Sequence, residues 1–168
     1  QETTSVQQQA DEKQKKIDYQ KKIEGKKYFK ESQKYYNTHF PEKAWKSIKK
    51  AISLDKKPIY YVQAHLIYWA LADEGRVNTR ERKNKSREYI SKLLEPHVDE
   101  IFEQKDLDHV FFQGVMLFHG LGVKQDKTKA IKILEKAHDK GMLSATLYLI
   151  FYYDSQRNLR SFDYYSIG

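Results

Sequence analysis

The sequence predicts an all-α protein built as a short stack of antiparallel helical hairpins. Three observations lead to this prediction. No alternating run of Val, Ile and Thr is long enough to form a strand. The prolines Pro41, Pro58 and Pro96 stand where helices could begin or end. Lys-Ala pairs recur at the same spacing in two distant segments, which indicates an internal repeat.

The predicted elements follow one another with short connections. Residues 1–10 are rich in Gln and are expected to form a disordered leader. A mostly polar helix is predicted from Asp11 to about Tyr36. Further helices are predicted near residues 41–54, 59–74, 79–94, 106–119, 126–140 and 143–155. The helical domain is therefore expected to span 11–156. Residues 157–168 form a Tyr-rich tail without helical periodicity, which could cap the final repeat or belong to an interface.

The second helix of each hairpin carries the repeat. Its mark is a lysine followed by Ala, Ser or, once, Leu, repeated after two helical turns so that both of the following side chains share one face. The pairs are Lys43-Ala44 with Lys50-Ala51, Lys85-Ser86 with Lys92-Leu93, and Lys129-Ala130 with Lys136-Ala137. A small side chain lets another helix approach closely, while the lysine beside it stays in water.

The first helix of each hairpin repeats as well. Three segments align at constant offsets: Ala64, Trp69, Ala72 and Gly75; His109, Gly114, Leu117 and Gly120; and Ala145, Ile150 and Tyr153. The repeating unit is thus a helix, a tight turn, a second helix and a loop, used about three times. Each hairpin buries its apolar face on its neighbours.

One stretch resembles a known family. The run QGVMLFHGLGV at 113–123 is followed by Asp126, Lys129-Ala130, Glu135-Lys136-Ala137, Gly141, Ala145 and Leu149. This pattern resembles a Sel-one-like repeat, a relative of the tetratricopeptide repeat, with a close match over 109–150. The resemblance implies a right-handed solenoid of about three repeats plus an N-terminal helix. It also implies an adaptor role, because proteins of this kind bind other proteins.

Several residues are predicted to shape the hairpins. Gly120 and Gly122 stand at the turn, where a positive φ or a close backbone approach is needed. Asp126 is a candidate N-cap, and Gly141 ends the helix that follows. Gly114 lies within a helix and is expected to allow close packing. The remaining packing positions are Ala130, Ala137 and Ala145. A phosphate-binding loop at 120–122 is disfavoured, because no strand precedes it and no Lys-Ser/Thr follows.

A candidate partner-binding stripe follows the first helices. The resemblance implies that the first helices line the concave face. Their positions off the packing pattern are Ile67, Leu71, Phe112, Met116, His119, Tyr148 and Tyr152. Exposed, these side chains would anchor a partner. The alternative is that they belong to the core, since an aromatic stripe at helical spacing is often buried. The sequence leaves both open.

The net charge of +8 is spread along the chain. Residues 11–34 carry nine lysines against five acids, whereas residues 95–108 are acidic. Such interrupted charge is typical of solvated helix faces. Nucleic acid is therefore not an expected partner, because no binding motif accompanies the charge.

Catalytic chemistry is not expected. The six histidines are scattered, and none forms a His-Glu-x-x-His pair. His109, beside Asp106 and Asp108, comes nearest to a site. No nucleophile motif of the Gly-x-Ser-x-Gly type is present. The sequence therefore predicts no cofactor and no metal.

The sequence favours a binding protein outside the cytoplasm. The first residue is Gln1, which fits a removed signal peptide, and there is no cysteine. The sequence contains no run of 18 apolar residues, so no membrane span is predicted. Taken with the resemblance, this favours a periplasmic or secreted immunity protein that blocks a toxic effector enzyme. The alternatives are an adaptor or scaffold protein and, for location, a cytoplasmic protein. The oligomeric state is left open.

Overall fold

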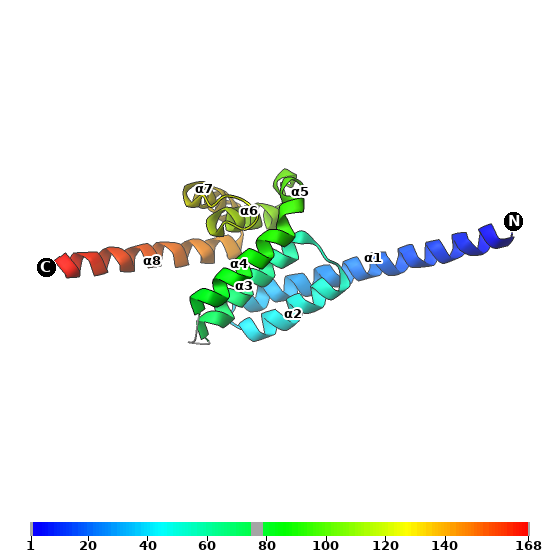
Figure 1. Cartoon of the computed structure of the whole chain (residues 1–168), viewed down its shortest axis with the longest axis horizontal. Coiled ribbons are helices and arrows are strands. Elements are labelled where there is room, and N and C mark those ends of the chain that lie inside the picture. Colours follow the sequence, from blue (N-terminus) through cyan, green and yellow to red (C-terminus); the bar gives the residue numbers. More distant parts are fainter. Residues whose placement is uncertain (1, 75–78, 168) are drawn as a thin grey trace. The chain divides into compact units, whose positions relative to one another are not determined.

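Figure 1 shows a computed structural model of the chain, which describes the backbone of residues 2–74 and 79–167 and the side chains of 5–74 and 79–157. Every secondary-structure element of the described residues is a helix, so the predicted all-α class is confirmed. The chain divides into two compact units, residues 1–71 (unit 1) and residues 72–168 (unit 2).

Unit 1 is built on a pair of helices, α1 (Glu2–Asn37) and α2 (Pro41–Leu54), which lie side by side (Figure 1). Pro41 occupies the first turn of α2, where its missing N–H costs nothing. Ala44 and Ala51 of the repeated Lys-Ala pairs are fully buried. The first part of α3 (Pro58–Glu74) completes the core of this unit, because Tyr60 stacks on Phe29 with ring centroids 4.8 Å apart.

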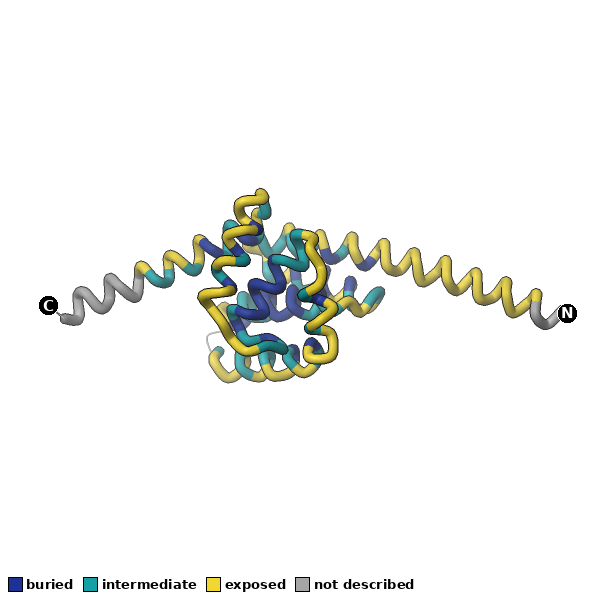
Figure 2. Tube along the Cα trace, turned by 90° about the horizontal axis from the view of Figure 1, so that it is seen from above, coloured by how far each residue is buried: buried dark blue, intermediate teal, exposed yellow. Residues whose placement is uncertain are grey.

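The N-terminal part of α1 corrects one prediction. Residues 2–10, expected to be a disordered leader, form the first turns of the helix. They contain neither Gly nor Pro, so nothing in the sequence interrupts the helix. From residue 5 to residue 24 every side chain is exposed, as the unbroken yellow trace in Figure 2 shows. Burial of α1 begins at Gly25.

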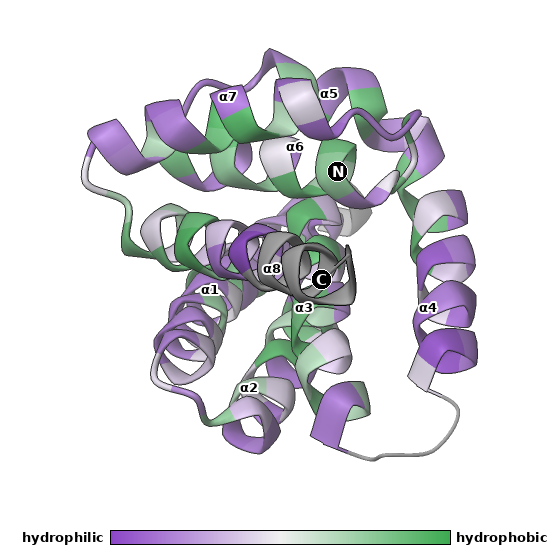
Figure 3. Cartoon of the chain, turned by 90° about the vertical axis from the view of Figure 1, so that its left-hand side faces the viewer, coloured by the Kyte–Doolittle hydropathy of each residue, from purple (hydrophilic) through white to green (hydrophobic). Residues whose placement is uncertain are grey.

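Unit 2 contains the remaining elements, which are α4 (Thr79–Leu94), a 3-10 turn η1 (Glu95–His97), α5 (Val98–Glu103), α6 (Leu107–His119), α7 (Lys127–Asp139) and α8 (Leu143–Ile167). Residues 111–117 of α6 are buried without interruption. A helix that is buried on all sides belongs to the middle of a core. Helix α6 packs on α5 and α7, and α7 packs on α8 (Figure 3).

Two features of unit 2 differ from expectation. The short helix α5 was not predicted, since six residues after Pro96 carry too little periodicity to be recognised. Residues 157–167, expected to form a tail without helix, continue α8. As at the N-terminus, no Gly or Pro interrupts this segment before Gly168.

The three copies of the second helix differ in their packing. Ala130 and Ala137 of α7 are fully buried, as are their counterparts in α2. In α4, however, the buried residues are Ile90 and Leu94, whereas Ser86 and Leu93 are half-buried. The middle copy therefore keeps the helix of the repeat but not its small-residue face.

Candidate protein-binding surface

The structure places most of the predicted partner-binding stripe in the core. Ile67, Phe112 and Met116 are 0% exposed, and His119 is also buried. These four residues cannot contact a partner in this conformation, so their assignment as binding residues is wrong. The physical reason for the three in α6 is that residues 111–117 are buried on every side, so that no face of the helix between them is left for a partner. Leu71 is half-buried.

Tyr148 and Tyr152, the last members of the stripe, are half-buried in an aromatic cluster between α6 and α8. The Phe118 ring meets both of them edge-on, with centroids 5.5 Å from Tyr148 and 5.6 Å from Tyr152. The Tyr148 hydroxyl also forms a hydrogen bond with Nε2 of His119. Lys127 places its Nζ 5.3 Å from the centre of the Phe118 ring. The cluster fastens α8 to the end of α6, and its outer edge remains accessible.

The hairpin turn between α6 and α7 has the geometry that the glycine pattern predicts. Gly120 has a φ of 70° and caps α6, and Gly122 has a φ of 69°. The Leu121 amide donates back to the carbonyl of Met116 at 2.9 Å, which closes the end of the helix. The carboxylate of Asp126 accepts from the Lys129 amide at 3.0 Å and starts α7.

The helices of this hairpin approach closely at Gly114. A Cβ built on Gly114 would lie 2.8 Å from Cγ of Leu134 in α7, closer than real side chains come. Leu134 is itself fully buried. Gly114 thus lets α7 lie directly on α6. Helix α7 ends at Asp139, and Gly141, two residues later, has a φ of 87°.

Helix α8 presents an uncovered apolar face. Leu143, Ile150 and Phe151 are 59%, 53% and 72% exposed, and the half-buried Leu147 lies between them. Their spacing of four, three and one residues brings the four side chains together on one side of the helix. On the opposite side, Ala145 and Leu149 are buried, and the Tyr153 hydroxyl donates to a carboxylate oxygen of Glu135 in α7 at 2.8 Å. That hydrogen bond raises the pKa of Tyr153. We call Leu143, Leu147, Ile150 and Phe151 the α8 face.

The repeat alignment explains why this face is bare. Ile150 is the counterpart of Gly114, which α7 covers with Leu134. In the predicted repeat alignment, α8 thus corresponds to α6. Within the described part of unit 2, no helix packs on the α8 face in the way that α7 packs on α6. Ile150 aligns with a covered residue and is nevertheless 53% exposed.

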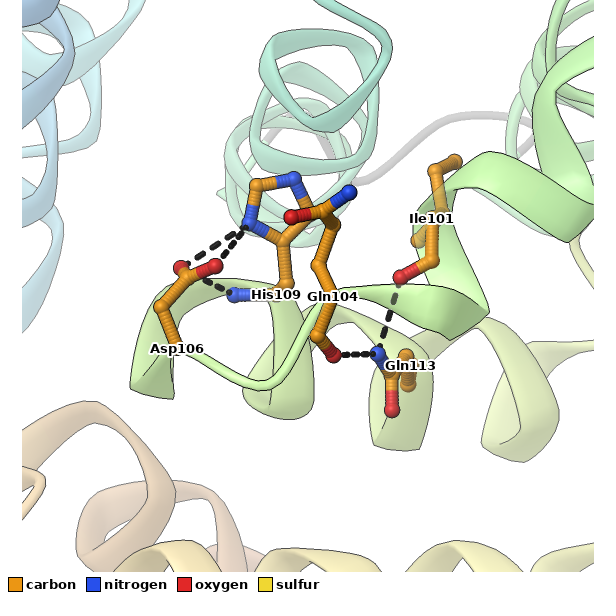
Figure 4. Close-up of polar contacts among 5 residues, drawn as sticks. All are labelled: Ile101, Gln104, Asp106, His109 and Gln113. Carbon is orange, nitrogen blue, oxygen red and sulfur yellow. Dashed lines mark hydrogen bonds and ion pairs between the residues drawn. The ribbon is translucent and has the colours of Figure 1, made fainter.

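The pair Asp106 and His109, the nearest thing to a catalytic pair in the sequence, caps a helix (Figure 4). The Asp106 carboxylate accepts from the His109 amide at 3.2 Å and lies 2.8 Å from Nδ1 of the same residue. Partial burial acts to raise the pKa of Asp106, but the hydrogen bonds from His109 outweigh it, and the pKa lies below its usual value. Close by, Nε2 of Gln113 donates to the carbonyls of Ile101 and Gln104 and holds the connection before α6. These contacts start α6 and fix its approach.

Comparison of the chain with protein-family models, curated proteins and solved structures found no match. We therefore infer function from the residues of the chain itself.

Two further properties concern metals and membranes. In the described ranges, no three His, Cys, Asp or Glu side chains gather into a group that could hold a metal ion. Among the described helices, none combines the length and the apolar character needed to cross a bilayer.

Proposed function

We propose that the chain is a non-catalytic helical-repeat module of the Sel-one-like kind, which binds another protein through the α8 face. The observation that carries the proposal is the exposure of Ile150, the counterpart of a residue that α7 covers. In a solenoid each hairpin is stabilised by its neighbours, so an uncovered first helix is an incomplete repeat. A partner that covers the α8 face would complete it.

The chemistry of the α8 face indicates what the partner contributes. The four side chains form a row about two turns long, which matches the anchor spacing of a helix bound along a helix. Between residues 143 and 157 the only charged side chains are Asp154 and Arg157, so the row carries no net charge. An apolar helix face, with small and aliphatic side chains like the face of α7, fits this surface.

The specific form we propose is an immunity protein that blocks a toxic secreted enzyme outside the cytoplasm. Its support is the resemblance of residues 109–150 to Sel-one-like repeats together with a bare apolar face. Blockade of this kind requires only a stable complex, and apolar anchors at the centre of an interface supply most of its binding energy.

The test is affinity capture from envelope and secreted fractions of the source organism, with the purified chain and two variants as bait. Phe151→Ser removes the most exposed side chain of the α8 face, whereas Tyr89→Ser removes a similarly exposed aromatic side chain from α4. We expect one protein to be retained in stoichiometric amounts by the wild type and by Tyr89→Ser. Phe151→Ser should lose it.

The identity of that protein separates the two forms of the proposal. An enzyme whose toxicity is neutralised by the wild type but not by Phe151→Ser supports an immunity protein. If a non-toxic envelope protein is retained in the same way, the chain is still a protein-binding module, but the proposed immunity role is wrong. Equal retention by both variants would show that the α8 face is not the binding surface.

A further inference from the structure

The net charge of the chain is not spread evenly between the two units, because most of the acidic residues lie in unit 2. Residues 1–71 contain 15 lysines, no arginine and 8 acids, whereas residues 72–168 contain 16 basic and 15 acidic residues. Unit 1 therefore carries nearly all of the net charge, and lysine alone supplies its positive charges. Lysine presents a hydrated point charge without the planar fork of arginine, which suits contact with a diffuse anionic surface.

Six of the nine lysines of α1 fall on one side of the helix. The last four follow one another at intervals of four residues, about one turn, and two earlier lysines lie on the same side. The set, which we call the lysine face, is Lys15, Lys16, Lys22, Lys26, Lys30 and Lys34, and all six are exposed. From the first to the last, the face is about 28 Å long at 1.5 Å per residue. Within that interval two carboxylates border it, since Asp18 is four residues before Lys22 and Glu31 is three before Lys34.

The lysine face is not neutralised within the protein. No lysine of α1 takes part in an ion pair among the described residues. Like charges four residues apart, such as Lys22, Lys26 and Lys30, destabilise a helix slightly. Helix α4 is different, because its Lys85 pairs with Glu81 at 3.1 Å. The charge of α1 is thus left available to something outside the chain.

Two other exposed side chains lie among these lysines. Tyr19 is 67% exposed and Ile23 is 47% exposed, and each is three or four residues from members of the lysine face. An aromatic ring and an aliphatic side chain between lysines are typical of a helix that lies on a lipid surface. There the apolar groups reach below the headgroups, while the ammonium groups stay beside the phosphates.

We propose that the lysine face docks unit 1 on an anionic lipid surface, with Tyr19 and Ile23 reaching into the headgroup layer. A flat bilayer can contact a straight helix along its whole length, and this contact requires no complementary shape. A protein surface would have to follow that line, and protein interfaces are enriched in arginine, which unit 1 lacks, and depleted in lysine. Clusters of four to eight basic residues on a helix are typical of proteins that bind acidic lipids.

The test is co-sedimentation of the purified chain with lipid vesicles at roughly physiological ionic strength. The vesicles contain phosphatidylcholine with about one third phosphatidylglycerol. The variant with Lys22→Gln, Lys26→Gln and Lys30→Gln removes three charges from the lysine face. The matched control carries Lys129→Gln, Lys132→Gln and Lys136→Gln, which removes three exposed lysines from α7. Glutamine keeps the helix propensity of lysine, so both variants should fold, and circular dichroism checks this.

We expect the wild type and the α7 control to bind the anionic vesicles within about threefold of each other. The α1 variant should bind at least about tenfold more weakly, because each lysine near such a surface contributes appreciably. Ile23→Ser should weaken binding several-fold at high salt as well, since its contribution is not screened. Pure phosphatidylcholine vesicles should retain almost none of the protein.

Three results would overturn the proposal. Equal losses in the α1 variant and the α7 control would show that net charge alone drives adsorption. Unchanged binding by the α1 variant would remove the lysine face from the contact. Tighter binding of a 20-base-pair duplex or of poly-glutamate, lost in the α1 variant but indifferent to Ile23→Ser, would replace the lipid with another polyanion. Phe151→Ser should leave vesicle binding unchanged, so failure here is distinguishable from failure of the protein-binding proposal.

Discussion

Gly114 and Leu134 determine how closely α6 and α7 can pack, because a Cβ on the glycine would lie only 2.8 Å from Cγ of the leucine. Both residues are buried, so a methyl group added at Gly114 could not be accommodated by turning it or the Leu134 side chain into solvent. A glycine inside a helix costs about 1 kcal/mol relative to alanine. That cost is offset here by the contact between the helices, because the glycine allows α7 to lie directly on α6.

Gly114→Ala should therefore destabilise the protein although alanine favours the helix. We expect a loss of about 1–2 kcal/mol in the free energy of unfolding, because overpacking in a core outweighs the gain in propensity. Denaturant unfolding measures it, with Lys132→Ala on the exposed side of α7 as the control. A gain in stability for Gly114→Ala would mean that the two helices can separate without cost.

Gly120→Val should destabilise the hairpin turn. The φ of 70° at Gly120 is strained for any β-branched residue, and the new side chain would also meet Cβ of Gln125. We expect a loss of about 1–3 kcal/mol. Asparagine tolerates a positive φ better, so Gly120→Asn should lose clearly less in the same thermal melt. Equal losses would show that space, and not backbone conformation, decides this position.

Phe112→Ala should cost about 3–5 kcal/mol of stability, because it empties a fully buried site. This loss distinguishes a core residue from a binding residue, because substitution of an exposed binding residue would leave the thermal melt unchanged. Phe151→Ala is the matched comparison, since its ring is 72% exposed, and we expect a change below about 0.5 kcal/mol. A thermal melt of Phe112→Ala that matches the wild type would return this residue to the candidate surface.

The cap at Asp106 predicts how stability responds to acid. Its pKa is lower in the folded chain than the ordinary value of 3.8, so the folded state favours the carboxylate. The stabilisation is fully present above pH 3.8, and it is lost as the pH falls through the lower, folded pKa. Asp106→Asn keeps a capping side chain but does not titrate. The variant should therefore lose less stability than the wild type between about pH 5 and pH 2, as measured by urea unfolding.

The sequence predicted those parts of the fold that depend on local chemistry. Gly120, Asp126 and Gly141 mark the ends of helices through backbone conformation and capping, and such signals are readable in a single segment. The burial of Ala130 and Ala137 followed from their spacing. The all-α class followed in the same way.

What depends on the surroundings of a helix was not predictable. The periodic spacing of Phe112 and Met116 is the same whether the residues face a partner or a core, and only the burial of α6 on every side decides between them. Ile150 differs in the opposite direction, because it aligns with Gly114, which α7 covers, and yet it is 53% exposed. The helical state of residues 2–10 was missed because a polar segment without Gly or Pro is compatible with either helix or disorder.

The central claim is that the α8 face binds a partner protein. It is tested most directly by the dissociation constant of the captured partner for the wild type, for Ile150→Ser with Phe151→Ser, and for Tyr89→Ser. We predict that the double variant binds at least about 30-fold more weakly, which corresponds to about 2 kcal/mol, while Tyr89→Ser stays within about twofold of the wild type. Equal affinity for all three proteins, with unchanged helical content, would contradict the claim.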